Sequence, residues 1–230
     1  MKEMLEESVF LGVLISLGAY FIGMYLKRKT GWAICNPFVV AVVLIVVFLL
    51  LTGIPYTTYN QGSHIISYLL TPATICLAVP LYQQVELLKK NYKAVAAGIV
   101  AGVITSACTI LVMAMLFHFD HSAYVTFLPK SITMAIGMGI TQELGGNVAV
   151  TVTAIALTGI AGSLIADKLM HVFHIEEPIA KGIAIGSASH AMGTARAMEM
   201  GQVEGAMSGL SIVVSGIITV ISATIFSWLY

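Results

Sequence analysis

The sequence predicts an all-α membrane protein, a polytopic helix bundle of about eight segments. Hydrophobic residues make up 58% of the 230 residues and charged residues only 10%, whereas soluble domains carry about 25% charged residues. The charges are also clustered, because no Asp, Glu, Lys or Arg occurs in 30–85, 94–119, 144–166 or 205–230. Uncharged runs of this length are typical of helices that cross a bilayer, which need about 20 apolar residues each.

The same composition excludes several classes of function. The formal net charge is zero, which argues against nucleic acid as a partner. Cys35, Cys76 and Cys108 have no metal-ligand spacing, and we interpret them as small buried hydrophobic residues. No nucleophile elbow, P-loop or HExxH pattern is present, and adjacent residues such as Ser189 and His190 point about 100° apart on a helix. We therefore expect no enzyme activity, no cofactor and no metal.

Eight apolar segments are expected to cross the bilayer, at 8–26, 37–54, 65–84, 94–117, 124–142, 147–169, 179–198 and 206–229. The first has acidic residues before it and Lys27-Arg28-Lys29 after it, the reverse of a signal peptide, so it is expected to remain as an anchor. Basic residues in short loops mark the cytoplasmic side. That side receives seven of the eleven basic residues, namely Lys27, Arg28, Lys29, Lys89, Lys90, Lys93 and Arg196. Both termini are then outside, although one re-entrant segment would reverse everything after it.

Two of the eight segments contain residues that break helices. The third contains Pro72 and Pro80; the fifth contains Pro129 and ends at Gly145-Gly146. Proline removes a backbone donor and clashes with the preceding turn, so we expect breaks or kinks there. Backbone freed at membrane depth is tolerated where protein buries it or where it lines a wet cavity. The two proline-broken segments are therefore predicted to border a cavity.

These two segments also resemble each other. Residues 72–81 align with 129–138 at an offset of 57, with proline, a hydroxyl residue, isoleucine and alanine in common. A duplication with copies at 65–117 and 124–169, within one integral membrane domain (1–230), is one interpretation. Chance matching in so apolar a chain is the other. Paired broken helices in repeats are typical of transporters, although the predicted topology makes these copies parallel.

The seventh segment is the most polar of the eight. Ser187, His190 and Thr194 lie three and four residues apart and share one helix face. An ionisable group inside a membrane is costly and tends to face a substrate path or a proton relay, while the simpler interpretation is a histidine satisfied by neighbouring hydroxyls. Arg196 lies about 240° around a regular helix from His190. It therefore shares the histidine's face only if the helix is broken, and can instead pair with Glu199.

A second polar group surrounds Lys130, which follows Pro129 near the start of a helix. Free backbone amides at a helix start favour anions, and Ser131 and Thr133 add hydroxyl donors. These residues are predicted to bind a small carboxylate. The alternative is a lysine that reaches the membrane interface. The complete predicted substrate site comprises Thr74, Lys130, Ser131, Thr133, Ser187, Ser189, His190 and Thr194. Proton transfer or gating is assigned to His190, Glu143 and Arg196.

Four ordered motifs resemble those of the LrgB/CidB family of bacterial membrane proteins. They are Pro72-Ala-Thr-Ile-Cys-Leu-Ala-Val-Pro80-Leu-Tyr, Pro129-Lys-Ser-Ile-Thr133, Gly145-Gly146 and Ser189-His-Ala-Met-Gly-Thr194-Ala-Arg. The resemblance covers nearly the whole chain. It implies a multi-pass protein of the bacterial cytoplasmic (inner) membrane. The family also resembles the carboxyl-terminal half of the plastid glycolate/glycerate transporter, which implies a small monocarboxylate as cargo.

Two hypotheses of function follow. In the first, the chain transports or facilitates small monocarboxylates of the pyruvate, glycolate or glycerate type. In the second, which the resemblance also implies, it is an antiholin-like regulator of an LrgA/CidA-type holin-like partner and of murein hydrolase activity. The small residues Gly182, Gly186, Ser189 and Gly193 would then form the partner surface, and such a stripe also makes a homodimer plausible. Lysine, histidine and paired prolines favour the first hypothesis, since packing alone needs none of them.

Overall fold

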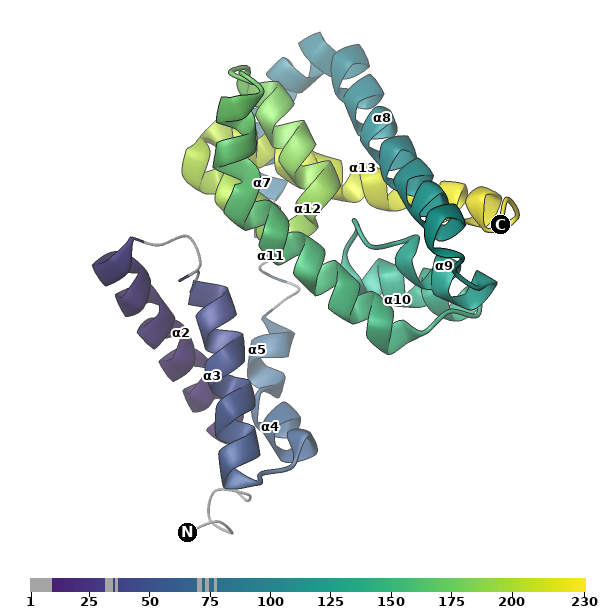
Figure 1. Ribbon diagram of the computed structural model, residues 1–230. Coiled ribbons are helices and arrows are strands. Elements are labelled where there is room, and N and C mark those ends of the chain that lie inside the picture. Colours follow the sequence, from purple (N-terminus) through teal and green to yellow (C-terminus); the bar gives the residue numbers. More distant parts are fainter. Residues whose placement is uncertain (1–9, 32–34, 36, 70–71, 73–74, 77) are drawn as a thin grey trace. The chain divides into compact units, whose positions relative to one another are not determined.

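The computed structural model describes residues 10–31, 35, 37–69, 72, 75–76 and 78–230, and every regular element in them is a helix (Figure 1). The all-α prediction is therefore confirmed. The chain divides into two compact units, Met1–Cys76 and Leu77–Tyr230. Among the described residues, four helices are long and apolar enough to cross a membrane: α2 (Leu11–Thr30), α8 (Val85–Phe117), α11 (Val148–Val172) and α13 (Gln202–Ser227). The expected count of eight spans is not confirmed.

The first unit consists of α2, α3 (Pro37–Thr52), α4 (Tyr56–Gly62) and α5 (His64–Tyr68). Gly23 lets α2 approach the start of α3, because a Cβ at Gly23 would lie 2.8 Å from the Cα atom of Pro37. A hydrogen bond of 2.8 Å between Ser16 Oγ and Tyr59 Oη joins α2 to α4. The basic run predicted to follow the first span occupies the last turn of α2.

The second unit begins with α7 (Ala78–Gln83) and continues into the 33-residue helix α8. At about 1.5 Å per residue, α8 is about 50 Å long and exceeds the bilayer's apolar thickness of about 30 Å. Pro80 lies in the first turn of α7, where proline is tolerated. Residues 70–71, 73–74 and 77, which include the predicted site residue Thr74, are outside the described residues.

The fifth predicted segment folds back on itself. Helix α9 (His121–Phe127) and helix α10 (Met134–Glu143) are separated by a turn that contains Pro129. The ends of the segment opposite the turn, which we call its feet, lie together. Ser122 Oγ donates to Gly145 O at 3.2 Å, and the Asn147 amide donates to Thr126 Oγ1 at 2.8 Å. Gly145, at φ +80, turns the chain towards α11. We call α9, its turn and α10 the first hairpin. The turn lies at the position where the sequence predicted a break, beside Pro129.

The seventh predicted segment, α12 (Pro178–Met200), also reverses. His190 has φ 42 and ψ −137, which interrupts the helix. A Cβ at Gly193 would lie 3.1 Å from Ile185 O, and Ala197 shares a buried cluster with Ile185. In a continuous helix residues 185 and 197 would lie about 18 Å apart. The arms 178–189 and 191–200 are therefore antiparallel, and we call them together the second hairpin.

The two hairpins enter the unit from opposite ends. The first hairpin packs against the carboxyl-terminal part of α8, where Ala107, Ile110 and Ala114 share a buried cluster with Tyr124. The second begins beside the amino-terminal part of α8, where Val95 and Ile99 share a cluster with Ile183. Figure 1 shows α9 and α10 at the lower end of α8, and α12 beside α11. The tips of the hairpins, at Pro129–Thr133 and at His190, therefore approach each other partway along α8.

Helix α11 runs past both hairpins in the reverse order to α8. Near its start, Thr151 Oγ1 donates to Thr126 O of the first hairpin at 2.8 Å. Further along, a Cβ at Gly159 would lie 2.6 Å from the ring of His190 at the second tip. Ala166 then joins the cluster around Ile185. Helix α8 precedes the first hairpin and helix α11 precedes the second, and the two helices run past the hairpins in opposite directions.

Helix α13 has a polar inner face and an apolar outer face. Ser208, Ser211, Ser215 and Thr219 are all at most 8% exposed, and they recur at helical spacing. The exposed side chains of the same helix are mostly apolar, namely Val213, Ile217, Val220, Ile221 and Ile225, with Gln202 and Thr224 as exposed polar residues. A helix with this polarity suits lipid outside and a polar interior.

Three sequence expectations need correction. Segments 124–142 and 179–198 are not single crossings, because each reverses at its tip. Arg196 was expected on the opposite side of the membrane from Lys168, but it pairs with Asp167, the neighbour of Lys168. Arg196 lies there because α12 reverses at His190, so the second arm returns to the end at which the first arm begins. The cysteines were expected to be buried, whereas Cys76 and Cys108 are exposed and Cys35 is half-buried, with all three thiols free.

Candidate functional site

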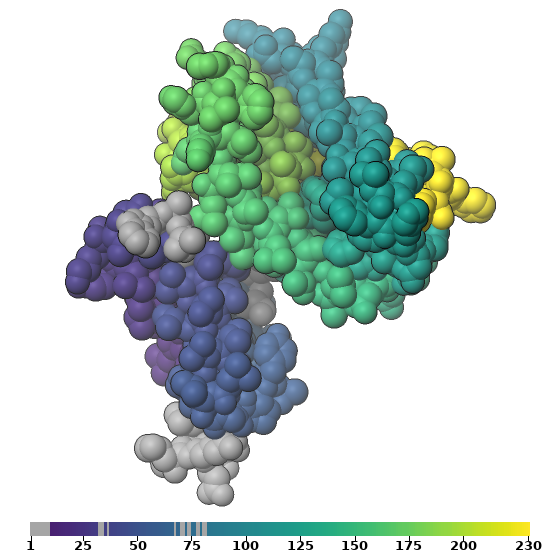
Figure 2. Space-filling view, in the orientation of Figure 1, coloured from purple at the N-terminus to yellow at the C-terminus, as the bar shows by residue number. Residues whose placement is uncertain are grey.

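A groove of about 1020 Å³ runs through the second unit, between α8, α11, the tip of the first hairpin and the first arm of α12. In Figure 2 yellow-green atoms of the carboxyl-terminal helices are visible between the green atoms of α11 and the blue-green atoms of α8. Small residues line the walls of the groove, including Gly98, Ala101 and Gly102 of α8 and Gly162 of α11. Four predicted site residues line it: Lys130, Ser131, Ser187 and Ser189.

Lys130 brings the positive charge of the groove to the tip of the first hairpin. Its ammonium donates to Ser131 Oγ at 2.9 Å and to Ser106 Oγ at 3.4 Å, and these two hydroxyls are 3.2 Å apart. In the described part of the chain every ion pair involves Arg196, so the Lys130 charge has no carboxylate partner there. The other charged residue among those that line the groove is Glu177, at the foot of the second hairpin.

The second hairpin contributes two serines near its tip. Ser187 Oγ donates to Ile183 O at 2.7 Å, and Gly102 of α8 allows this hydroxyl close, since a Cβ there would lie 2.9 Å from it. Ser189 is 4% exposed, and its hydroxyl bonds to no described residue. Every fully enclosed side-chain nitrogen and oxygen in the described chain has a partner. The Ser189 hydroxyl therefore opens onto the groove.

His190 and Thr194 do not line the groove. The His190 Nε2 atom lies 3.0 Å from Ile155 O of α11, in hydrogen-bond contact. Thr194 Oγ1 donates to His190 O at 3.0 Å and lies 2.7 Å from Ser208 Oγ of α13. These bonds fix the second tip between α11 and α13. The shared helix face predicted for Ser187, His190 and Thr194 is lost because the helix reverses at His190.

The remaining predicted residues lie at the ends of elements. Thr133 is the N-cap of α10 without a side-chain cap bond, and the exposed Glu143 ends the same helix. Arg196, on the return arm of α12, donates to Asp167 of α11 and to Glu199. The expected Arg196–Glu199 pair is therefore present. None of these residues is among those that line the groove.

The small-residue stripe predicted as a partner surface is occupied within the chain. A Cβ at Gly182 would lie 2.7 Å from the Met207 side chain, and one at Gly186 would lie 2.7 Å from the Cα atom of Ser208. Both glycines therefore allow α13 to pack against the first arm of α12. Gly193 serves the contact between the two arms. The stripe does not present a free surface for a second protein, because α13 and the return arm already cover it.

Sequence reasoning missed Ser106, Asp167 and the hydroxyl face of α13. The hydroxyl face of α13 could have been predicted, because residues 208, 211, 215, 219 and 222 recur every three or four positions and all carry hydroxyls. Ser106 had none, because one serine in an apolar helix is common. Its role depends on the reversal of the first hairpin, which brings Ser131 to α8.

The groove thus combines one cation that has no carboxylate partner in the described chain, several hydroxyl donors and mostly apolar walls. An ammonium with hydroxyls beside it can bind a small anion through charge-assisted hydrogen bonds. The apolar walls suit the short carbon chain of an organic acid better than a strongly hydrated inorganic ion. Ser189 and His190 diverge at the tip, because the His190 ring contacts Ile155 O behind the groove, so these two residues do not form a nucleophile–base pair.

Comparison with known proteins shows the family of the chain. The profile of the LrgB-like family matches residues 16–229. The chain belongs to this family. It is 37% identical over 220 residues to the antiholin-like protein LrgB of Bacillus subtilis (strain 168), covering 95% of each chain. It is also 37% identical over 218 residues to the proteins of the same name from Bacillus cereus (strain B4264) and Bacillus anthracis (strain CDC 684 / NRRL 3495), covering 94% of this chain and 95% of theirs.

No solved structure matches the chain. The family membership confirms the resemblance drawn from the four motifs. Together with the four long apolar helices, it identifies a multi-pass membrane protein of the antiholin-like LrgB type.

Proposed function

We propose that this LrgB-family protein transports or facilitates small monocarboxylates, of the pyruvate, glycolate or glycerate type, across the bacterial cytoplasmic membrane. The observation that carries the proposal is the Lys130 ammonium, which lies in the groove with serine hydroxyls as its partners and without a carboxylate among the described residues. Lys130 is half-buried, and a charge partly removed from water without a counterion is unfavourable, so an anionic cargo would supply the missing counterion.

The arrangement of the hairpins supports a transported rather than a permanently bound anion. Transporter sites commonly lie near the bilayer midplane, where discontinuous helices from inverted units meet. Here the two tips come from opposite ends of α8, and the groove passes between them. Ser131, Ser187 and Ser189 would contact the cargo. His190 would act from behind, because its contact with Ile155 holds the second tip against α11.

Substitution of Lys130 tests the proposal directly. A hydrogen bond to a charged group contributes about 1.5 to 3 kcal/mol, so Lys130→Ala should weaken carboxylate uptake into proteoliposomes about 10- to 100-fold. Lys168→Ala, which removes an exposed lysine outside the groove, is the matched control and should transport normally. Uptake that survives Lys130→Ala at the control level would contradict the proposal.

A second function is favoured by the name of the Bacillus relatives, antiholin-like protein LrgB. In this alternative the protein regulates an LrgA/CidA-type holin-like membrane partner and has no cargo. The two functions separate in a lysis assay with the Lys130→Ala variant. Loss of uptake together with loss of lysis control indicates that regulation depends on the anion. Normal lysis control by a variant that transports nothing supports regulation through contact with the partner.

A further inference from the structure

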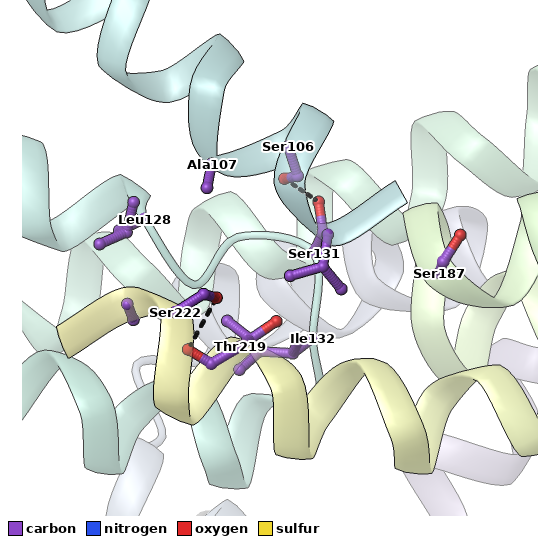
Figure 3. A pocket seen from close by; sticks show the side chains of 10 residues that line it. Ser106, Ala107, Leu128, Ser131, Ile132, Ser187, Thr219 and Ser222 are labelled. Carbon is purple, nitrogen blue, oxygen red and sulfur yellow. Dashed lines mark hydrogen bonds between the residues drawn. The ribbon is translucent and has the colours of Figure 1, made fainter. Parts of the chain in front are cut away.

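A small cavity lies behind the Lys130 cluster, on the side of α13 rather than of the groove. It has a volume of about 10 Å³, and hydroxyl-bearing residues make up five of its ten lining residues: Ser106, Ser131, Ser187, Thr219 and Ser222. In Figure 3 Ser106 and Ser131 face each other on one side of the cavity, and Thr219 and Ser222 project from α13 on the other. The cavity therefore joins α8, both hairpins and α13.

Two of these hydroxyl groups lack a partner that the described chain provides. Ser106 and Ser131 bond to each other and both accept from Lys130, so one hydroxyl hydrogen of the pair remains without an acceptor. Thr219 is 8% exposed, and its hydroxyl bonds to no described residue; because every fully enclosed side-chain oxygen in the described chain has a partner, this hydroxyl faces the cavity that Thr219 lines. Ser187 and Ser222, in contrast, donate to the backbone oxygens of Ile183 and Thr219.

We propose that this cavity binds one water molecule, which accepts from the Ser106–Ser131 pair and bonds to the Thr219 hydroxyl. A site of about 10 to 15 Å³ holds one water when two to four polar groups surround it. Burial of an unpaired hydroxyl is unfavourable, and a water at this position satisfies the free hydrogen and the free hydroxyl together.

Other small occupants fit less well. A sodium or potassium ion would be repelled by the Lys130 ammonium, whose Nζ atom is only 3.4 Å from Ser106 Oγ. A sodium or potassium ion also could not accept a hydrogen bond from the free hydroxyl hydrogen of the Ser106–Ser131 pair. A chloride ion is larger than water and does not fit a cavity of this volume. Ser106, Ser131 and Ser187 line both the cavity and the groove, so the two sites adjoin, and the water site requires no anion in the groove.

The bound water gives Thr219 a testable role. If the cavity is wet, Thr219→Val removes a bond to the water and should lower the melting temperature in detergent by about 2 to 4 °C. If the cavity is dry, the same change removes an unpaired hydroxyl and should leave the melting temperature unchanged or raise it, which would overturn the proposal. Thr224→Val is the matched control, because Thr224 lies on the exposed face of α13 and bonds to Val220 O; it should leave the melting temperature unchanged.

A structure of the wild-type protein at about 2 Å provides the second measurement, which needs no variant to fold. We expect a density peak about 3 Å from Thr219 Oγ1 and from a hydroxyl of the Ser106–Ser131 pair. Crystals grown with rubidium bromide should show no anomalous signal there. An empty cavity, or an anomalous peak from either ion, would refute the proposal.

Discussion

His190 has a backbone conformation that is unusual for any residue other than glycine, with φ 42 and ψ −137. Such a conformation costs about 1 to 3 kcal/mol and persists where surrounding contacts determine it. Here Nε2 is 3.0 Å from Ile155 O, and Thr194 Oγ1 donates to His190 O. The side chain and the carbonyl of one residue are thus both held by neighbours, which stabilises the reversal of α12.

The space for the histidine ring depends on Gly159. A Cβ there would lie 2.6 Å from His190 Cε1 and 2.9 Å from Met192 Sδ. Overpacking of this kind costs about 1 to 3 kcal/mol, so Gly159→Ala should lower the melting temperature by several degrees. Gly139→Ala is the control, because a Cβ at this helical position meets nothing within 4 Å and alanine favours helix. If the two variants melt alike, the ring does not occupy the space beside Gly159 and the tip is arranged differently.

Sequence reasoning identified His190 and Lys130 as unusual because ionisable groups are rare in apolar segments. It could not show that His190 turns the chain, since no proline or glycine stands at that position to indicate a break. Pro129, by contrast, gave a direct signal, and the structure reverses there. The difference is physical: proline forbids a helix locally, whereas the turn at His190 arises from contacts with α11 and α13.

At the scale of elements, the two hairpins set the architecture of the second unit. Their arms are only 7 to 12 residues long by their bounds, too short to cross an apolar layer of about 30 Å. The polar backbone at their tips is surrounded by α8, α11 and α13 rather than by lipid, as membrane-depth irregular backbone requires.

A disulfide can test the reversal of α12. In a variant without the native cysteines, Ile185→Cys and Ala197→Cys should be linked by an oxidant or a short bifunctional reagent, because both residues lie in one buried cluster. A continuous helix would hold them about 18 Å apart, beyond the reach of a disulfide. The linked protein is detected by a tryptic fragment that contains both peptides.

The control pair is Ile179→Cys with Ala191→Cys, which has the same spacing in sequence. One residue is at the foot of the first arm and the other is beside the tip, so this pair should stay unlinked. Equal linkage of the two pairs, or linkage of neither, would contradict the hairpin.

The span count shows the limit of hydropathy in a protein of this kind. The segments 124–142 and 179–198 are as long as a crossing, and their apolar content alone does not distinguish a crossing from a hairpin. The spacing of small residues in α12 also does not distinguish a continuous helix from a hairpin, because small residues line both the contact with α13 and the contact between the two arms. Because hydropathy predicts a crossing at 179–198, Arg196 was assigned to the wrong side of the membrane.

For the whole molecule, a hairpin at α12 changes the membrane topology. Both feet of α12 lie at one end of the unit, so Glu176→Cys and Gln202→Cys should react with an impermeant maleimide from the same side of the membrane. His121→Cys, at the opposite end of α8, should react from the other side. All three positions are exposed.

Labelling of intact cells and of inverted vesicles gives this comparison. Eight simple crossings require Glu176→Cys and Gln202→Cys to label from opposite sides, and that result would exclude the hairpin. The same measurement decides the orientation, which the basic residues predicted only on the assumption that every segment crosses.

Short hairpin arms also have a consequence for biosynthesis. A hairpin with arms of only 7 to 12 residues returns to its starting side, and neither arm is long enough to be held in the bilayer as a full span is. The hairpins are therefore expected to settle after α8, α11 and α13 have been inserted, when those helices can surround their tips. Assembly of this protein then has two stages, and the groove forms only in the second, after the ribosome has released α13.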